Sequence, residues 1–148
     1  HRVAPEKQVN IFKDLKKSMP DIEFLVTQEE QLTKDEYHEL LGTAKIVFSA
    51  NLQETLGISC YEGTLVNTIP LVPDRLSYSE MYNEIYTYPS EWTRSFKHYI
   101  KHKKELISVI TDIMDNYPIY LGSLIDQTDE LLQFFHGEKL YNTISSSV

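Results

Sequence analysis

The sequence predicts an α/β protein with a Rossmann-like parallel sheet and flanking helices. Short apolar runs rich in β-branched residues occur at 46–48 and 71–72, and such runs are typical of buried strands. Amphipathic helical segments precede and separate these runs, and the chain from residue 91 to 136 is helical in pattern. Strands that alternate with helices pair in parallel, and the helices then cover the faces of the sheet.

Composition sets the limits of the prediction. The 148 residues are 41% hydrophobic and 24% charged, which suits one domain with its own core. A formal net charge of −8 disfavours a nucleic-acid surface, so we expect no nucleic-acid contact from this domain. Cys60 is the one cysteine, which excludes an internal disulfide, and we expect it in the core. No apolar run fits a membrane span and no signal peptide is visible, so we expect a cytoplasmic location.

The first third of the chain predicts a helix, a strand and a second helix. Over residues 4–19, apolar side chains recur at spacings of three and four, as on one face of a helix. These side chains are Val9, Phe12, Leu15 and Met19. The run IEFLVT at 22–27 is expected to form a strand. Thr33 and Glu36 have the spacing of a capping box, which predicts a helix that ends near Thr43.

Segment 45–73 predicts strand, loop, helix and strand, the unit from which a parallel sheet is built. The helix is expected over about 58–68, and Pro70 closes the unit before the second strand opens at 71–72. Ligands of such sheets bind at the carboxyl ends of the strands, beside the helix N-termini. Gly57 allows a close backbone approach there, and the free N–H groups suit a phosphate. The residues expected at this edge are Glu54, Thr55, Gly57, Ile58 and Ser59.

Two acids frame the same loop. Glu54 precedes it, and Glu62 lies about one turn into the helix, with seven residues between them. A carboxylate at that point of a helix can reach the hydroxyls of a ribose. The spacing therefore suits a nucleotide-diphospho-sugar, with the ribose on Glu62, the diphosphate on the helix N-terminus and the transferable sugar near Glu54. The alternative is that both acids are solvated and only favour the helix dipole.

Three motifs resemble those of a known enzyme family. The segment ETLGISCYE at 54–62, between the strand at 46–48 and the strand opened by Pro70, resembles the Glu-x7-Glu motif of retaining glycosyltransferases with the two-domain GT-B fold. The segment HRVAPEK at 1–7 resembles the Arg-x4-Lys segment of that family. The segment PDRLSYSEMY at 73–82 is similar to the P-x-R-L-x-Y-x-E stretch of the tRNA-queuosine mannosyltransferases. The resemblance covers roughly residues 1–90 in the order expected.

The resemblance implies a catalytic role for Arg2, Lys7 and Glu54. The two cations would neutralise the diphosphate of the donor as it leaves, which is charge stabilisation without a metal or other cofactor. Glu54 would orient the transferred sugar and steady an oxocarbenium-like state. The residues implied in donor binding are Glu62, Gly57, Ile58, Ser59, Thr55, Tyr78 and Glu80, of which Tyr78 would stack on a sugar or base. One departure is Gly63, where the family usually has Ala; the glycine should only weaken the helix.

The same resemblance implies a partner domain. The chain would be the C-terminal, donor-binding half of the enzyme, and its own N-terminal half would supply most of the acceptor site. A sheet strand is expected just before Arg2, from the parent chain or from another copy. The donor base, the sugar and the class of acceptor stay open. Other classes also stay open: a non-catalytic nucleotide- or phosphate-binding α/β module, or an interaction domain whose acids are merely on the surface.

The rest of the chain predicts a helical turn at 78–83, a strand at 85–88 and then helices. The first is expected over 91–117, either unbroken or bent near Lys101, and the last over 119–135. The domain would then be 1–136, followed by a tail at 137–148. One apolar face of the first helix is expected to carry Trp92, Phe96, Tyr99 and Ile100, and another to carry Leu106, Ile107, Ile110, Ile113 and Met114. The residues of the last helix expected to face inward are Leu121, Leu124, Ile125, Thr128, Leu131, Leu132 and Phe135.

Two further sets of side chains have a simple structural interpretation. Tyr78, Tyr82, Tyr86 and Tyr88 are expected to pack half-buried at the rim of the sheet. His98 and His102 have a metal-ligand spacing of four residues. Lysines surround them and no third ligand is near, so a solvated helix face is expected instead.

Overall fold

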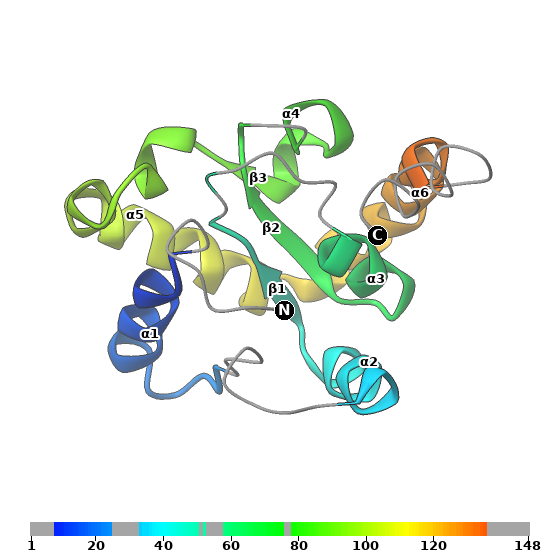
Figure 1. Cartoon of the computed structure of the whole chain (residues 1–148), viewed down its shortest axis with the longest axis horizontal. Coiled ribbons are helices and arrows are strands. Elements are labelled where there is room, and N and C mark those ends of the chain that lie inside the picture. Colours follow the sequence, from blue (N-terminus) through cyan, green and yellow to red (C-terminus); the bar gives the residue numbers. More distant parts are fainter. Residues whose placement is uncertain (1–7, 25–32, 51, 53–57, 76–77, 136–148) are drawn as a thin grey trace.

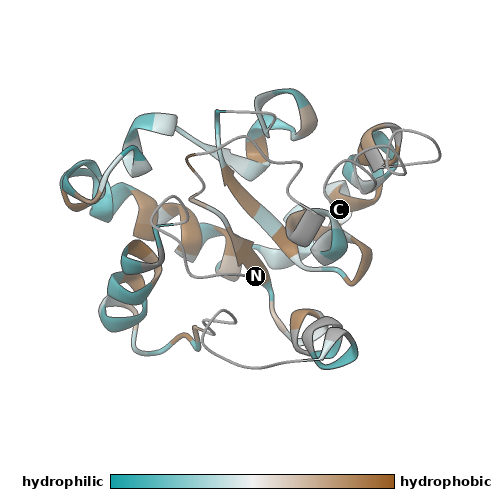
Figure 2. Ribbon diagram, viewed as in Figure 1, coloured by the Kyte–Doolittle hydropathy of each residue, from teal (hydrophilic) through white to brown (hydrophobic). Residues whose placement is uncertain are grey.

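The computed structural model describes residues 8–24, 33–50, 52, 58–75 and 78–135 (Figure 1). Within this part of the chain, β1 (Ile46–Phe48), β2 (Ile69–Pro73) and β3 (Thr87–Tyr88) form a parallel sheet in the order β1-β2-β3. Ile46 pairs with Ile69 on one side of β2, and Val72 pairs with Thr87 on the other. The prediction of a parallel sheet with flanking helices is therefore confirmed, for a sheet of three short strands within the described residues. Figure 2 shows hydrophobic residues gathered on β1 and β2, at the centre of the fold.

Pro70 is the second residue of β2, so the strand begins at Ile69 and not at the predicted residue 71. Its partner in register is Val47 of β1. The N–H of Ile69 donates to the carbonyl of Lys45, and Leu71 accepts from Ser49, so these two residues face β1. Successive backbone groups of a strand point to opposite neighbours. Pro70 therefore lacks its N–H on the β3 side, where the pairing begins only at Val72, and no ladder hydrogen bond is lost.

The first two helices follow the sequence prediction. Helix α1 spans Val9–Ser18 and α2 spans Lys34–Thr43. The Thr33 hydroxyl accepts from the N–H of Glu36 at 3.1 Å, which is the expected cap of α2. The strand expected at 22–27 is wrong for residues 22–24, which have no strand pairing. The N–H of Ile22 instead donates to Met19, in a turn that ends α1; residues 25–27 lie outside the described part.

Helix α3 (Ile58–Leu65) is shorter than expected because the chain reverses in a Schellman motif. Asn67 takes the left-handed conformation with φ 63°, which a short amide side chain tolerates. The N–H of Thr68 donates to Gly63 at 2.8 Å, and the N–H of Asn67 donates to Thr64 at 3.4 Å. This turn places β2 directly after the helix.

Gly63 has a packing role beyond lowering helix propensity. A Cβ built there would lie 3.1 Å from Val47 Cγ1 and 3.4 Å from Thr68 Cβ. The glycine therefore lets α3 pack closely on β1, and the expectation that it would only weaken the helix was incomplete.

The segment after β2 folds as short helices around β3. Helix α4 spans Tyr78–Met81, the 3-10 helix η3 spans Glu84–Tyr86 and the 3-10 helix η4 spans Ser90–Thr93. Helix α5 begins at Phe96 because the extended Ser95 caps it and accepts from the N–H of His98 at 3.2 Å. The helix expected over 91–117 is thus broken at 94–95 rather than near Lys101.

The last two helices are α5 (Phe96–Asp115) and α6 (Tyr117–Phe135). Their buried faces include Tyr99, Leu106, Ile110, Ile113, Leu124 and Leu131, as predicted. The inward prediction is wrong for Ile125 and Leu132, which are 71% and 39% exposed. On the predicted apolar face of α5, Phe96 and Ile100 are likewise 39% and 51% exposed. The apolar face of each helix is therefore wider than the part of the helix that packs against the rest of the domain. Within the described ranges, neither these helices nor any other has the length and apolarity to cross a membrane.

The tyrosines expected at the rim are buried in the core instead. Tyr78, Tyr82, Tyr86 and Tyr88 are all at most 6% exposed. The hydroxyl of Tyr86 donates to the Tyr120 carbonyl at 2.8 Å. Because a buried hydroxyl with an acceptor costs little, a tyrosine can lie as deep as a phenylalanine.

A polar junction joins α1 to α5 on the left of Figure 1. The carboxylate of Asp14 accepts from Lys103 Nζ at 2.8 Å and from the Tyr99 hydroxyl at 2.6 Å. These two hydrogen bonds lower the pKa of Asp14 below its ordinary value of 3.8. The same contact raises the pKa of Tyr99, after the larger effect of burial.

Asp14→Asn is expected to lower the free energy of unfolding by about 1 kcal/mol at pH 7. A depressed folded-state pKa stabilises the fold above the unfolded-state pKa, and this stabilisation is lost as the pH falls through the folded-state value. Urea titrations of both proteins should therefore begin to converge below about pH 4 and coincide only below the folded-state pKa of Asp14. Asp21→Asn, a change at an exposed carboxylate, is the control and should leave stability nearly unchanged. A difference that stays constant from neutral to acidic pH would contradict the role of the Asp14 charge.

Candidate functional site

The candidate site is the edge of the sheet where the three strands end. In a parallel sheet these ends meet at one edge, which is where ligands bind in open α/β folds. Here β1 continues into Ser49 and Ala50, β2 into Asp74 and Arg75, and β3 into Pro89. Helix α3 begins at this same edge, since it runs back along the sheet between β1 and β2.

Half of the predicted site residues lie outside the described part of the chain. They are Arg2, Lys7, Glu54, Thr55 and Gly57. Ile58 and Ser59 form the first turn of α3 at the candidate edge, as the phosphate prediction requires of their backbone. Glu62 lies in the second turn of α3 and is half-buried. Their predicted contacts with a ligand stay predictions.

Tyr78 and Glu80 both lie on α4, close after the end of β2. The ring of Tyr78 is fully buried, and its hydroxyl lies 3.1 Å from the Ser49 hydroxyl at the end of β1. In this position Tyr78 packs under the edge and offers no ring face for stacking on a sugar or base. Glu80 is exposed.

Arg75 connects three backbone segments at the edge. Its guanidinium donates to the carbonyls of Ser90 at 2.8 Å, Ala50 at 3.0 Å and Thr93 at 3.4 Å. Burial lowers the pKa of Arg75, yet a guanidinium stays charged at any physiological pH. The sequence analysis did not predict this structural role of Arg75. No local motif reveals it, because the acceptors lie 15 to 25 residues away.

Gln8 and Tyr88 form further hydrogen bonds to the same backbone segments. The Gln8 amide donates to the Ala50 carbonyl at 3.1 Å and to the Thr93 carbonyl. The Tyr88 hydroxyl donates to the Ser49 carbonyl at 2.5 Å and lies 3.0 Å from the Thr93 hydroxyl. The ends of β1 and β3 are therefore joined to η4 and to the residue before α1. Such a network gives the candidate edge a rigid base.

The buried titratable groups near the edge are unsuited to acid–base work at neutral pH. Burial raises the pKa of the Tyr82 and Tyr88 hydroxyls, so both stay protonated. Within the described residues the Tyr82 hydroxyl has no hydrogen-bond partner. Burial also raises the pKa of the Cys60 thiol to about 12. Cys60 is therefore a core residue, as predicted, and not an activated nucleophile.

The two histidines of α5 have structural partners. His98 Nδ1 lies 2.7 Å from the Ser95 hydroxyl at the start of the helix. The ring of His102 stacks on Trp92, with ring centroids 6.1 Å apart. In the part of the chain that the structure describes, no three His, Cys, Asp or Glu side chains come together as a group that could hold a metal ion.

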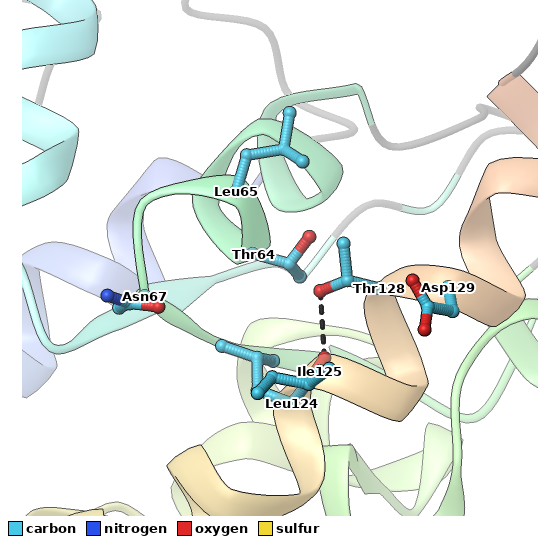
Figure 3. Close-up of a pocket in the computed structure, with 7 residues that line it drawn as sticks. All are labelled: Thr64, Leu65, Asn67, Leu124, Ile125, Thr128 and Asp129. Atoms are coloured by element: carbon cyan, nitrogen blue, oxygen red, sulfur yellow. Dashed lines mark hydrogen bonds between the residues drawn. The ribbon is translucent and has the colours of Figure 1, made fainter.

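A shallow pocket lies at the other end of α3, away from the candidate edge (Figure 3). It lies between the last turn of α3, with Thr64 and Leu65, and the middle of α6. Asn67, in the turn that leads into β2, forms its third side. Thr128 lies in the wall of the pocket, and its hydroxyl already donates a hydrogen bond to the Leu124 carbonyl at 2.8 Å.

Comparison with known proteins gives no family. No family model, no curated protein and no solved structure matches the chain.

Proposed function

We propose that this chain is the Rossmann-like donor-binding domain of a retaining GT-B glycosyltransferase. The observation that carries the proposal is the unit β1, α3 and β2, in which the helix begins at the carboxyl edge of a parallel sheet. The Glu-x7-Glu segment runs along the chain from Glu54, before that helix, to Glu62 in its second turn. This arrangement supports a site for a nucleoside-diphosphate-sugar.

The proposed chemistry divides the donor among these groups. The N–H groups at the start of α3 bind the diphosphate, and Arg2 and Lys7 neutralise the charge that develops as it leaves. Glu62 binds the ribose, and Glu54 orients the transferred sugar. The network of Arg75, Gln8 and Tyr88 supports the proposal indirectly, because it fixes the strand ends beside which the donor would bind.

Calorimetric titration with UDP, GDP and ADP tests the proposal. One nucleotide is expected to bind in the micromolar to millimolar range, roughly −8 to −4 kcal/mol. Glu62→Ala removes the group that holds the ribose and should weaken binding about tenfold or more, which is about 1.4 kcal/mol. Glu105→Ala, at an exposed acid of α5, is the matched control and should bind like the wild type.

Two outcomes would contradict this assignment. Loss of binding in both variants would show a charge or folding effect rather than a ribose contact. A folded wild-type chain, verified by circular dichroism, that binds none of the three nucleotides would contradict donor binding by this domain. Binding without sugar transfer or donor hydrolysis by the full-length enzyme would favour the alternative, a non-catalytic nucleotide-binding module.

A further inference from the structure

Positive charge gathers on one side of this acidic protein. Eight of the 14 Lys and Arg residues fall within 13–17 and 94–104, where Asp14 is the only acid. These two segments thus carry a formal charge of +7, although the whole chain carries −8. The rest of the chain must then carry −15, so the asymmetry is large.

The fold brings both segments together. Lys103 of α5 bonds to Asp14 of α1 at 2.8 Å, and Lys17 acts on the same carboxylate electrostatically. Figure 1 shows α1 beside the start of α5, on the side of the molecule away from α2 and α6. Lys17 of α1 and Lys103 of α5 therefore lie close together, on the surface where the two helices meet.

Two large apolar side chains lie within this surface. Phe96 is 39% exposed and Ile100 is 51% exposed. They alternate along α5 with Lys97, Lys101 and Lys104, which are also exposed. Spacings of one, three and four residues place these five side chains on one side of a helix. We name these five residues, together with Lys17, the basic face.

We propose that the basic face binds the surface of an anionic lipid membrane. Lysines on the polar side of a helix and aromatic or aliphatic residues beside them are the combination that lies in a membrane interface. The lysines attract the anionic headgroups, while Phe96 and Ile100 enter the boundary of the acyl region. The lysine stems can extend along that boundary with their charges in water.

The exposed apolar pair distinguishes this surface from a nucleic-acid site. Phosphate backbones are bound by cations and hydrogen-bond donors, and Ile100 supplies neither. The acidic remainder of the chain would also repel an extended polyanion, whereas a membrane touches only one side of the protein. Binding to a membrane at this face is independent of the donor site proposed above.

Vesicle co-sedimentation of the whole chain tests the inference. The chain should bind phosphatidylcholine vesicles only when they contain phosphatidylglycerol, and binding should weaken as salt is added. Lys97→Glu with Lys101→Glu should weaken binding at least about tenfold. Phe96→Ser with Ile100→Ser should weaken binding even at low salt, because it removes the groups that insert.

The control variant is Lys34→Glu with Lys45→Glu, which changes the net charge by the same amount as Lys97→Glu with Lys101→Glu. Its two positions lie away from the basic face, in α2 and just before β1. It should bind like the wild type. Equal loss in the control would overturn the assignment to the basic face, and absence of binding to anionic vesicles at low salt would overturn the inference itself. Tighter binding to duplex DNA than to vesicles under the same conditions would overturn the choice of a lipid partner.

Discussion

Arg75→Met is expected to lower the free energy of unfolding by about 2–4 kcal/mol. The methionine keeps an apolar stem and removes the guanidinium that binds Ser90, Ala50 and Thr93. The Ser90 carbonyl loses its 2.8 Å donor, while the other two carbonyls keep the Gln8 amide. At a urea dependence of about 2 kcal/mol per molar, the midpoint should fall by roughly 1–2 M.

Two other variants test whether the loss of stability comes from the three hydrogen bonds of Arg75 or only from its charge. Arg94→Met, at an exposed cation between η4 and α5, should change stability by no more than about 0.5 kcal/mol. Arg75→Lys keeps the charge without the fork of donors and should recover only part of the loss. Equal midpoints for the Arg75→Met and Arg94→Met proteins would show that the three carbonyl contacts contribute nothing.

A double-mutant cycle tests whether the network acts as a unit. Gln8 and Arg75 share two acceptors, the carbonyls of Ala50 and Thr93. Removing both donors leaves those carbonyls without either partner, so the two losses should not add. Coupling energies for such neighbours are about 0.5–3 kcal/mol. This coupling would be measured from the urea midpoints of Gln8→Ala, Arg75→Met and the double variant.

Local signals in the sequence predicted local structure well. Thr33 and Glu36 are three residues apart, and their capping contact forms as expected. The apolar run at 46–48 is β1, and the apolar spacing of the first helix matches α1. In each case the physical cause lies within about one turn or one strand of the residues concerned.

The features that the sequence did not reveal depend on distant partners. Gln8 meets Thr93 across 85 residues, and Tyr88 meets Ser49 across 39. Pro70 is tolerated in β2 only because β3 begins to pair beyond it. Exposure of Phe96 and Ile100 likewise depends on where the other helices end. Sequence spacing carries no information on such contacts. The burial of the tyrosines and the exposure of the apolar residues on α5 and α6 were therefore not predicted.

In the candidate site, too, the local features were predicted and the features with distant partners were not. The position of α3 at the strand ends followed from the order of elements along the chain. The polar base of the edge, with Arg75 and Tyr88, did not follow from any motif. Arg2, Lys7 and Glu54 lie outside the described residues, so their roles rest on the resemblance to glycosyltransferases and, for Glu54, also on its spacing from Glu62.

Gln127→Leu is expected to destabilise the protein by about 2–4 kcal/mol and to loosen α4. Gln127 is fully buried in α6, where its amide donates to the Met81 carbonyl at 2.8 Å. Its side-chain oxygen accepts from the N–H of Asn83 at 2.7 Å. Leucine fills a similar volume but leaves a donor and an acceptor without partners. The Met81 carbonyl is then unsatisfied in a buried position and the Asn83 N–H in a part-buried one, at the end of the helix that carries Tyr78 and Glu80.

Hydrogen exchange would separate this local effect from global unfolding. In Gln127→Leu, the Asn83 amide should exchange faster than the loss of global stability alone explains, because its acceptor is gone. Asp126→Ala, at the exposed neighbouring position of α6, should leave that amide as protected as in the wild type. If exchange at Asn83 rises only in step with the core amides, α4 is held by its buried tyrosine and methionine rather than by Gln127. A loosened α4 should also weaken nucleotide binding if Glu80 contacts the donor, so the variant links the stability of this helix to the proposed site.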